Sequence, residues 1–430
     1  MASNRLLQHS VAFLHNHEIN LFLQIRRLYT RRGSKLRRSL STSPGARRRS
    51  VNLKATSKKV ASSTNRPSSH ELLKRRTRSG VEFDRDLYLK YASASHVPVM
   101  FCEVLETFRP PRLRSFVDCT LGAAGHSSAI IEAHRELELF VGMDLDTLAV
   151  DKARARIEAV IKDGFREKLK AYTHVRNFKY IKTVLGGVDD KLLSEGVDGI
   201  FMDLGISSMQ VDYPERGFSV LGDGPLDMRM DPQATLKAED ILNSWPEAEV
   251  GRILRDYGEE SNWRFLQKKI MNAREEGGLH STRELVDLVR KASGKSGGRQ
   301  GWIKTATRVF QALRIVVNDE LQTLENAIYA CFDCLSSGGR LAVISFHSLE
   351  DRIVKKAFLD ITENEGEDDE EDYEGKTNDE ISTETQIWTK QKVVGRNGTI
   401  LTKRPITPSE EEERLNRRCR SAKLRVFQKH

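Results

Sequence analysis

Between about residues 95 and 360, short apolar runs alternate with longer segments of helical periodicity. Such alternation is typical of a parallel α/β sheet whose strands are joined by helices. Five runs, each bounded by Gly, Asp or Ser, are predicted strands: Phe116 to Cys119, Leu137 to Met143, Ala171 to Val175, Gly199 to Leu204 and Arg340 to Phe346. The pattern therefore predicts a doubly wound sheet, in a globular part that begins near His96.

About 135 residues separate the fourth predicted strand from the fifth, too many for a loop or one crossover helix. Helical patterns cover 247–257, 261–275 and 285–292, and the last follows a capping box from Ser281 to Glu284. A long helix from Thr305 to Leu335 is expected to lead back to the sheet. We predict an inserted helical substrate domain at 235–303, between the core segments 95–234 and 304–360.

The region after the fifth strand begins with a helix from Ser348 to about Leu359. Residues 363–380 then carry eleven acidic side chains and one Lys, and such a run is typical of solvated, disordered chain. We predict an acidic insertion at 361–385. Residues 387–394 and 423–427 are predicted strands, with a short helix opening at Ser409, so that 386–430 form the C-terminal edge of the core.

The net charge of +9 is concentrated at the N-terminus. Residues 1–70 hold 15 Lys or Arg and one acid, which leaves 55 basic and 60 acidic residues, a balance of −5, in the rest. This Arg- and Ser-rich, acid-poor composition is typical of a transit peptide, although a basic arm that binds nucleic acid has the same composition. Residues 51–55 and the start Met1-Ala2-Ser3 favour the chloroplast, while paired arginines favour the mitochondrion as the alternative.

The composition supports neither a membrane protein nor a protein stabilised by a disulfide framework. No apolar run approaches the roughly 20 residues that a membrane span requires, so no membrane partner is expected. Five cysteines without repeated spacing do not form a disulfide framework. Cys331 and Cys334 match C-x-x-C but share one face of a predicted helix, so we expect core residues rather than the alternative, a metal or redox site.

A cofactor loop is predicted directly after the first strand. Residues 118–126 contain Gly122 and Gly125 in G-x-x-G spacing, whereas a dinucleotide site normally requires G-x-G-x-x-G to approach a pyrophosphate. The loop therefore favours S-adenosylmethionine, which has no phosphate. Asp144 ends the second strand 22 residues beyond Gly122, near the usual offset of a ribose-binding acid. A purely structural turn is the alternative for this loop.

Asp203 ends the fourth predicted strand, where open α/β sheets place their reaction sites. A nucleobase amine is a poor nucleophile, because its lone pair is conjugated with the ring, and a carboxylate that accepts its N–H improves it. Asp203 is the predicted catalytic residue, with an Asx cap of the loop as the alternative. No cysteine stands in the 203–210 loop, which favours methylation of a nitrogen over a pyrimidine carbon.

Several segments together resemble the MraW/RsmH family of ribosomal RNA methyltransferases: His96 to Met100, Asp118 to His126, Asp203 to Gln210, Arg216 to Ser219, Gly224 to Asp231, Phe310 to Ile315 and Ser345 to Arg352. The resemblance covers residues 95–360 and resumes at 405–424. It implies a Rossmann-like class I methyltransferase sheet with an inserted helical domain. It also implies methylation, with S-adenosylmethionine, of the N4 amine of a cytidine in the decoding region of small-subunit ribosomal RNA.

The resemblance also implies roles for single residues and a choice of partners. The cofactor-binding residues it implies are Ala124, Gly125, His126, Asp144, Phe178 beside the adenine, Asp203 and Gln210. The partner is small-subunit ribosomal RNA or the assembling small subunit, and a homodimer is left open. The sequence departs from the family in two places, since Ala124 replaces a usual glycine and Arg417 a usual proline. The Ala124 methyl group must therefore fit beside the cofactor.

Substrate contacts are expected from aromatic and basic side chains. The cytosine must leave any base stack to reach the methyl group, which requires apolar walls. Phe346, with Phe218, is a candidate wall, and His347 is a candidate contact, with core packing and loop positioning as the alternatives. Arg229 is a candidate phosphate ligand, as are residues 295, 299, 304, 308 and 314, against a merely solvated face.

Two other functions compete with methyl transfer. A nicotinamide-dependent oxidoreductase has a related fold, but it needs the G-x-G-x-x-G that is absent here. A ribosome-assembly factor without activity would bind RNA and transfer no methyl group. Asp144, Asp203 and Gln210 are all present, and this favours the enzyme.

Overall fold

The computed structural model describes residues 77–92, 97–110, 112–164, 166, 168–293, 298–362 and 392–430. The predicted transit peptide and most of the predicted acidic insertion lie outside the described residues. Within these ranges, no helix combines the length and the apolar composition needed to cross a bilayer.

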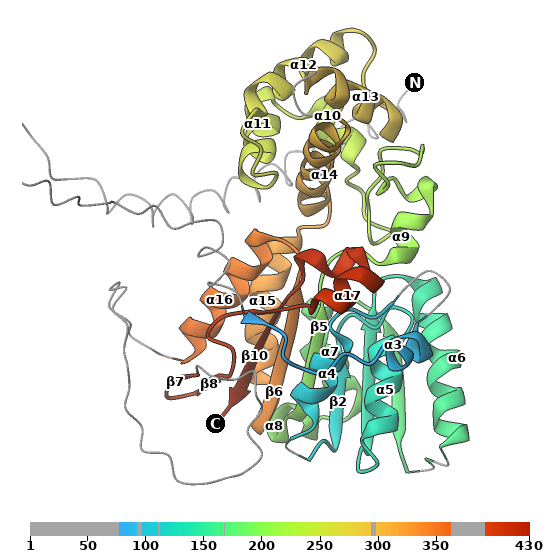
Figure 1. The fold of residues 1–430 in the computed structure, drawn as a ribbon, viewed down its shortest axis with the longest axis vertical. Coiled ribbons are helices and arrows are strands. Elements are labelled where there is room, and N and C mark those ends of the chain that lie inside the picture. Colours follow the sequence, from blue (N-terminus) through green and yellow to red (C-terminus); the bar gives the residue numbers. More distant parts are fainter. Residues whose placement is uncertain are drawn as a thin grey trace, which may run out of the picture. The chain divides into compact units, whose positions relative to one another are not determined.

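A mostly parallel sheet forms the centre of the fold (Figure 1). The described strands follow the order β1-β9-β10-β6-β5-β2-β3-β4, with β8 also paired to β10 and β7 to β8. The parallel strands are β2 (Ser115–Asp118), β3 (Leu139–Asp144), β4 (Lys170–Val175), β5 (Val197–Asp203) and β6 (Leu335–Ser345). The doubly wound α/β fold is confirmed, although β6 begins five residues before the predicted Arg340.

Helices pack on both faces of this sheet because neighbouring strand residues point to opposite sides. Phe116, Phe140 and Phe201 belong to one hydrophobic cluster, with α4 (Phe101–Phe108), α5 (Gly125–Ala133) and α6 (Thr147–Asp163). Val117 and Met202 belong to another, with α7 (Ile181–Val188), α15 (Glu320–Asp333) and α16 (Ser348–Thr362). A short α8 (Lys191–Glu195) precedes β5. The strands thus end between two helical layers.

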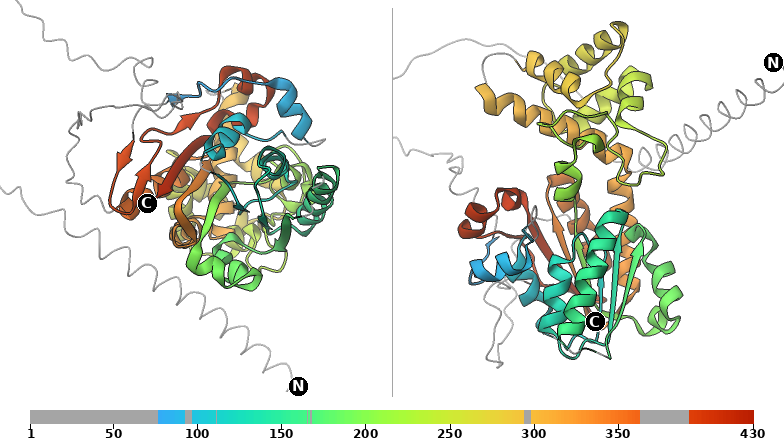
Figure 2. Two further views of the ribbon diagram at one scale, coloured as in Figure 1. Left: turned by 90° about the horizontal axis from the view of Figure 1, so that it is seen from below. Right: turned by 90° about the vertical axis from the view of Figure 1, so that its right-hand side faces the viewer.

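Helices between β5 and β6 share a third hydrophobic cluster and form one group in both figures (Figures 1 and 2). They are α10 (Ala238–Ser244), α11 (Glu247–Asp256), α12 (Trp263–Glu275), α13 (Thr282–Ala292) and α14 (Gly298–Val317), and α9 (Ser208–Asp212) precedes them. The capping box is confirmed, since Ser281 and Glu284 exchange two hydrogen bonds. The domain bounds 235–303 stay a prediction, because the cluster includes residues on both sides of them.

The prediction of one helix from Thr305 to Leu335 is wrong. The helix is interrupted between α14 and α15, where Asp319 has a φ of 46°. The Asn318 side chain holds this bend, because its amide donates to Met228 O and Arg314 O and its carbonyl accepts from Met230 N. The apolar periodicity continues through the break, so that the sequence pattern did not reveal it.

The C-terminal segment returns to the sheet as an antiparallel edge. It contains β7 (Val393–Val394), β8 (Gly398–Ile400), β9 (Ile406–Thr407), α17 (Glu410–Leu415), the 3-10 helix η5 (Arg417–Ser421) and β10 (Lys423–Lys429), which pairs with β6. The short helix after Ser409 and the strand at 423–427 are confirmed. Of the strand predicted at 387–394, the described part is a strand only at Val393–Val394.

The chain joins the fold before the predicted start at His96, and that prediction is wrong. A short β1 (Thr77–Arg78) pairs with β9, and α3 (Arg85–Tyr91) follows it. Tyr88 and Tyr91 of α3 are buried, and the Tyr88 hydroxyl accepts a hydrogen bond from Phe101 N. Seven helical residues are too few for a periodicity that a sequence pattern can show.

The pairing of β1 with β9 determines how much of the N-terminal segment can be removed without loss of stability. A chain that starts at Glu71 keeps β1, and we expect it to unfold at the same denaturant concentration as the full chain. A chain that starts at Ser79 loses the β1 pairing and the exposed Arg78–Glu413 ion pair, and we expect a loss of at most about 1–2 kcal/mol. If the Glu71 chain stays folded but loses RNA affinity, residues 1–70 are a binding arm.

Candidate active site

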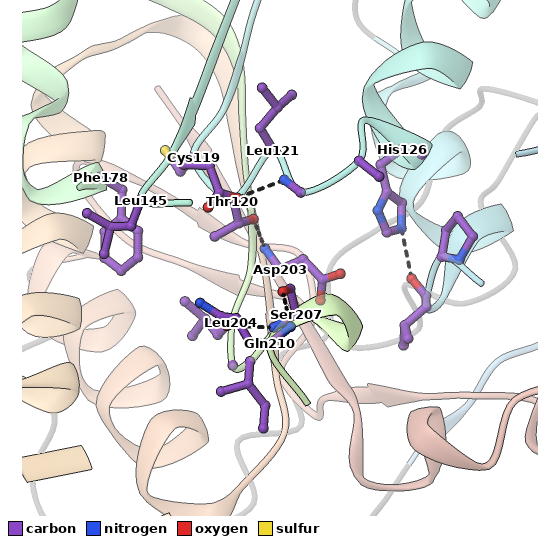
Figure 3. A pocket seen from close by; sticks show the side chains of 18 of the residues that line it. Cys119, Thr120, Leu121, His126, Leu145, Phe178, Asp203, Leu204, Ser207 and Gln210 are labelled. Atoms are coloured by element: carbon purple, nitrogen blue, oxygen red, sulfur yellow. Dashed lines mark hydrogen bonds between the residues drawn. The ribbon is translucent and has the colours of Figure 1, made fainter. Parts of the chain in front are cut away.

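A cavity of about 270 Å³ opens where β2, β3 and β5 end (Figure 3). Its lining comes from the loops after these strands, from residues 97–99, and from the C-terminal residues Asn416 and Arg418. Small-molecule sites begin at roughly this volume, and open α/β sheets place them at this end of the strands. The structure thus brings the predicted cofactor loop, Asp144 and Asp203 to one cavity.

The loop after β2 is fixed by the buried Asp118 carboxyl group. Its Oδ1 accepts a hydrogen bond from Thr120 N at 3.0 Å, and its Oδ2 accepts one from the Ser127 hydroxyl. Burial raises the pKa of Asp118 to about 6. At the other end of the loop, a Cβ on Gly125 would lie 2.8 Å from Pro98 Cγ, so that glycine is required by the close approach of residues 97–99.

The Ala124 side chain is not part of the cavity lining, and the cofactor-binding role of this residue stays a prediction. The side chain is fully buried in the cluster with Ile130 and Phe201. Its φ is 58°, in the left-handed region that glycine adopts without strain. The backbone angle, and not the space beside a ligand, is therefore what favours glycine at this position.

Ala124→Gly should consequently change the free energy of unfolding by less than about 1 kcal/mol. Relief of left-handed strain stabilises by about 1 kcal/mol, while loss of one buried methyl group costs about 0.8 kcal/mol and added unfolded-state freedom costs about 0.4–1 kcal/mol. Urea titration measures this difference, and donor affinity should stay unchanged. A several-fold change in donor affinity would mean that the methyl group does contact the ligand.

His126 lines the cavity, but its imidazole also anchors the wall. Its Nε2 donates to Val99 O at 2.9 Å, and the ring packs against Phe101 and Phe201. Because a carbonyl oxygen only accepts, this contact requires the proton on Nε2. His126 therefore holds residues 97–99 against the cofactor loop.

Asp144 ends β3 with both carboxylate oxygens directed at backbone amides. Oδ2 accepts from Gly122 N at 2.8 Å and Oδ1 from Asp146 N at 3.0 Å. Burial raises the pKa of Asp144. Each oxygen keeps a second lone pair for a ligand hydroxyl. Phe178, in the 3-10 helix η3 (Phe178–Tyr180), lines the same side of the cavity.

Asp203, at the end of β5, stands between Thr120 and Ser207 in Figure 3. Its backbone amide donates to Thr120 Oγ1 at 2.6 Å, which fixes the residue. Although Asp203 is only half-buried, its Oδ1 is out of reach of solvent and has no hydrogen-bond partner among the described residues. Burial, with the nearby Asp118, raises the pKa of Asp203 well above its ordinary value.

Gln210 closes the loop that follows β5. Its Oε1 accepts from Ser207 N at 3.1 Å, and its backbone amide donates to Ser207 Oγ at 3.2 Å. Gln210 is buried and lines the cavity. These reciprocal bonds fix the chain just beyond Asp203.

The carboxyl groups around the cavity favour a cationic ligand. Asp118, Asp144 and Asp203 all have a raised pKa, because each carboxylate is removed from water and the first lies close to the other two. A positive charge in the cavity lowers each of these pKa values and gains Coulomb energy from the same groups. The residues present therefore fit S-adenosylmethionine, whose reactive sulfur is a sulfonium.

Of the predicted substrate residues whose side chains the structure describes, only Phe346 lines the cavity, and residues 295 and 299 lie outside that set. Arg229 is bound to both oxygens of Asp227 at 2.7 Å and to the carbonyls of Pro232 and Ala234, so that its guanidinium is engaged within its own loop. Phe218 is buried in the hydrophobic cluster of the helices between β5 and β6, as expected for a core residue rather than a wall of the substrate site. A phosphate-binding role for Arg229 is therefore not favoured by its contacts.

His347 also lies outside the cavity lining. Its Nε2 is 3.1 Å from Glu350 Oε1, without the alignment of a hydrogen bond, and its Nδ1 accepts from Glu350 N. Glu320, His347 and Glu350 are close enough to share a metal ion, but Arg314 already binds both oxygens of Glu320 at 2.8 Å. This guanidinium supplies the positive charge that the cluster needs, and the loop-positioning alternative for His347 is favoured.

Sequence reasoning missed several residues of the cavity wall: Cys119, Arg156, Arg176, Ser207, Met230 and Arg418. Three of them, Cys119, Ser207 and Met230, stand in segments that carry the family resemblance, and Arg418 stands in the C-terminal stretch where it resumes. The others have no local pattern that distinguishes them from surface or core positions. Their place follows from how the strands are ordered, which brings distant loops together.

Comparisons with known proteins agree with this geometry. The MraW methylase family matches residues 93–430. Ribosomal RNA small subunit methyltransferase H of Heliobacterium mobile is 42% identical over 336 residues, which cover 78% of this chain and 98% of that protein. The protein of the same name from Brevibacillus brevis is 40% identical over 340 residues, with the same coverage of 78% and 98%.

Proposed function

Because the chain belongs to the MraW methylase family, and is thus a methyltransferase with S-adenosylmethionine as its methyl donor, we propose that it methylates the N4 amine of one cytidine in small-subunit ribosomal RNA. The observation that carries the proposal is the Asp203 carboxyl group. Its Oδ1 lies without a hydrogen-bond partner among the described residues, at the reaction end of the sheet. An exocyclic amine supplies the N–H donor that this oxygen lacks.

Cys119 lines the cavity, although no cysteine stands in the 203–210 loop. A hydrogen bond with Cys331, together with burial, raises the pKa of Cys119 well above its ordinary value. A thiol that keeps its proton is a poor nucleophile, and addition to a pyrimidine ring needs a thiolate. The chemistry of this side chain therefore argues against methylation of a pyrimidine carbon.

Different residues of the cavity contact the methyl donor and the base that accepts the methyl group. S-adenosylmethionine supplies an electrophilic methyl group on a sulfonium. Asp144 offers lone pairs to ribose hydroxyls, and Phe178 offers a flat apolar surface to the adenine. Asp203 accepts the amine N–H and so raises the electron density on N4, while Thr120 and the Ser207–Gln210 pair keep it in place. Alignment of amine and methyl group then provides the remaining rate enhancement.

The proposal includes an organelle, on the composition of residues 1–70 alone. The acid-poor, Ser-rich segment supports import into the chloroplast, with the mitochondrion as the alternative. A fluorescent fusion of residues 1–95 that colocalises with chlorophyll supports this part, and a cytosolic fusion protein contradicts it.

The proposal is tested in cells by mapping N4-methylcytidine in organellar small-subunit RNA, with and without the protein. One decoding-region cytidine should lose N4-methylation in the deletion strain and regain it with the wild-type gene. A modification that persists in the deletion strain, or a loss at another base only, contradicts the proposal.

A further inference from the structure

The 3-10 helix η5 carries a surface of three arginines, called the rim, whose middle residue Arg418 lines the cavity. Arg417, Arg418 and Arg420 are exposed, and Arg418 is itself part of the cavity lining. In Figure 1 the C-terminal segment around α17 lies at the end of the sheet that carries the cavity. Arg418 therefore stands at the cavity, and Arg417 and Arg420 lie within two residues of it on the same short helix.

The backbone below these arginines is held firmly. Asn416 Oδ1 accepts from Arg418 N at 3.0 Å, and its Nδ2 donates to Val97 O at 3.2 Å. Cys419, between Arg418 and Arg420, and Ala422, two residues beyond Arg420, are fully buried. The positions of the charges are thus set by packing, while the guanidinium groups remain in solvent.

The guanidinium groups are available for a ligand. Arg418 Nη2 lies 3.1 Å from Asp212 Oδ1, and both side chains are largely exposed, so that this ion pair contributes little and exchanges readily. In the part of the chain that the structure describes, neither Arg417 nor Arg420 has a side-chain ion-pair partner. Arg176, on the opposite wall of the cavity, is exposed as well.

The site therefore carries acidic groups inside the cavity and basic groups outside it. Asp144 and Asp203 lie inside the cavity and attract the cationic donor. The guanidinium groups of the rim do not attract a cationic donor. Guanidinium groups bind phosphate oxygens in bidentate geometry. The rim accordingly suits a polyanion that lies over the opening, while one base enters the cavity.

We propose that Arg417, Arg418 and Arg420 bind backbone phosphates of the RNA strand next to the target cytidine, with Arg418 leaving Asp212 for a phosphate. This inference rests on the proposed function and names the surface that recognises its substrate. Contacts to phosphates position the strand and do not read its sequence. The base itself is selected inside the cavity, by Asp203 and the walls around it.

The test compares R417Q/R418Q/R420Q with a matched control, R112Q/R114Q/K168Q. The control also removes three exposed cations. They stand at the amino ends of β2 and β4, and the cavity lies at the carboxyl ends of the strands. The probe is an unmethylated transcript of the small-subunit decoding region, titrated over a range of KCl concentrations. Since each phosphate contact on single-stranded RNA contributes roughly 0.7 to the slope of log affinity against log salt, the rim variant should lose about two units of slope. The control should keep the wild-type slope.

Equal slopes for the rim variant and the control contradict the inference, as does a loss of S-adenosylmethionine affinity in the rim variant, which would assign Arg418 to the donor. Product analysis separates this inference from the proposed function. A rim-dependent slope without any N4-methylcytidine rejects the proposed function and keeps the RNA surface. Normal N4-methylcytidine with equal slopes rejects the RNA surface alone.

Discussion

Asp203→Asn is expected to slow single-turnover methylation by roughly 10²–10⁴, the range for loss of a positioned acid-base group. The amide keeps the shape of the carboxyl group but removes the anionic acceptor that the amine N–H needs. RNA affinity should change much less, because the interaction strengthens only as charge develops on the amine. Quenched-flow measurement with saturating donor gives the rate, and filter binding gives the affinity.

The pH dependence of the same rate provides a second readout. Only the deprotonated Asp203 is an anionic acceptor, and burial raises its pKa, so the wild-type rate should fall as pH falls through this raised value. Asp203→Asn should lack that acidic limb. Bound donor lowers the pKa of Asp203 through its positive charge, so the limb measured with saturating donor should lie at lower pH than the limb of kcat/KM for the donor.

Asp151→Asn, on the exposed face of α6, is the matched control and should have the wild-type rate and pH profile. Near-normal turnover by Asp203→Asn would show that Asp203 only shapes its loop. Catalysis would then rest on the alignment of donor and amine alone.

Asp144→Ala should weaken S-adenosylmethionine binding tenfold or more. The variant removes the acceptor of two ribose hydroxyls, and hydrogen bonds to a charged group contribute roughly 1.5–3 kcal/mol each at most. It also frees Gly122 N, which Asp144 Oδ2 now binds, and so loosens the cofactor loop. Isothermal titration calorimetry measures the affinity directly, without any methyl transfer.

Asp144→Asn is the conservative partner of this variant. One carbonyl oxygen remains as an acceptor, so its donor affinity should lie between those of the wild type and Asp144→Ala. Unfolding curves of all three proteins show whether the fold is retained. Unchanged donor affinity in a folded Asp144→Ala would remove the ribose-binding role.

The sequence predicted the elements whose pattern is local and strong. Asp144 and Asp203 each end a short apolar run, and because parallel strands end at one edge of a sheet, both reach the same cavity. The break at Asp319 was invisible, because the apolar periodicity of α14 continues into α15. Tertiary hydrogen bonds from Asn318 hold this bend, and they have no counterpart in the local pattern.

Local sequence patterns also could not predict which side chains point into the cavity. Arg229 and Arg418 are both basic residues, yet Asp227 engages the first, whereas the second reaches the cavity. His347 and Phe346 are neighbours, but only Phe346 lines the cavity, while the histidine ring contacts Glu350 through both nitrogens. Such differences depend on contacts between residues far apart in the chain.

The central claim is tested most directly by one reconstituted reaction. The purified protein is incubated with isotopically labelled S-adenosylmethionine and small ribosomal subunits that lack the modification, and the RNA is digested to nucleosides for mass spectrometry. We expect the label in N4-methylcytidine, at one position, and its near absence at early times with Asp203→Asn. Label in 5-methylcytidine, in a ribose methyl group or in no nucleoside would contradict the assignment of this cavity to cytidine N4 methylation.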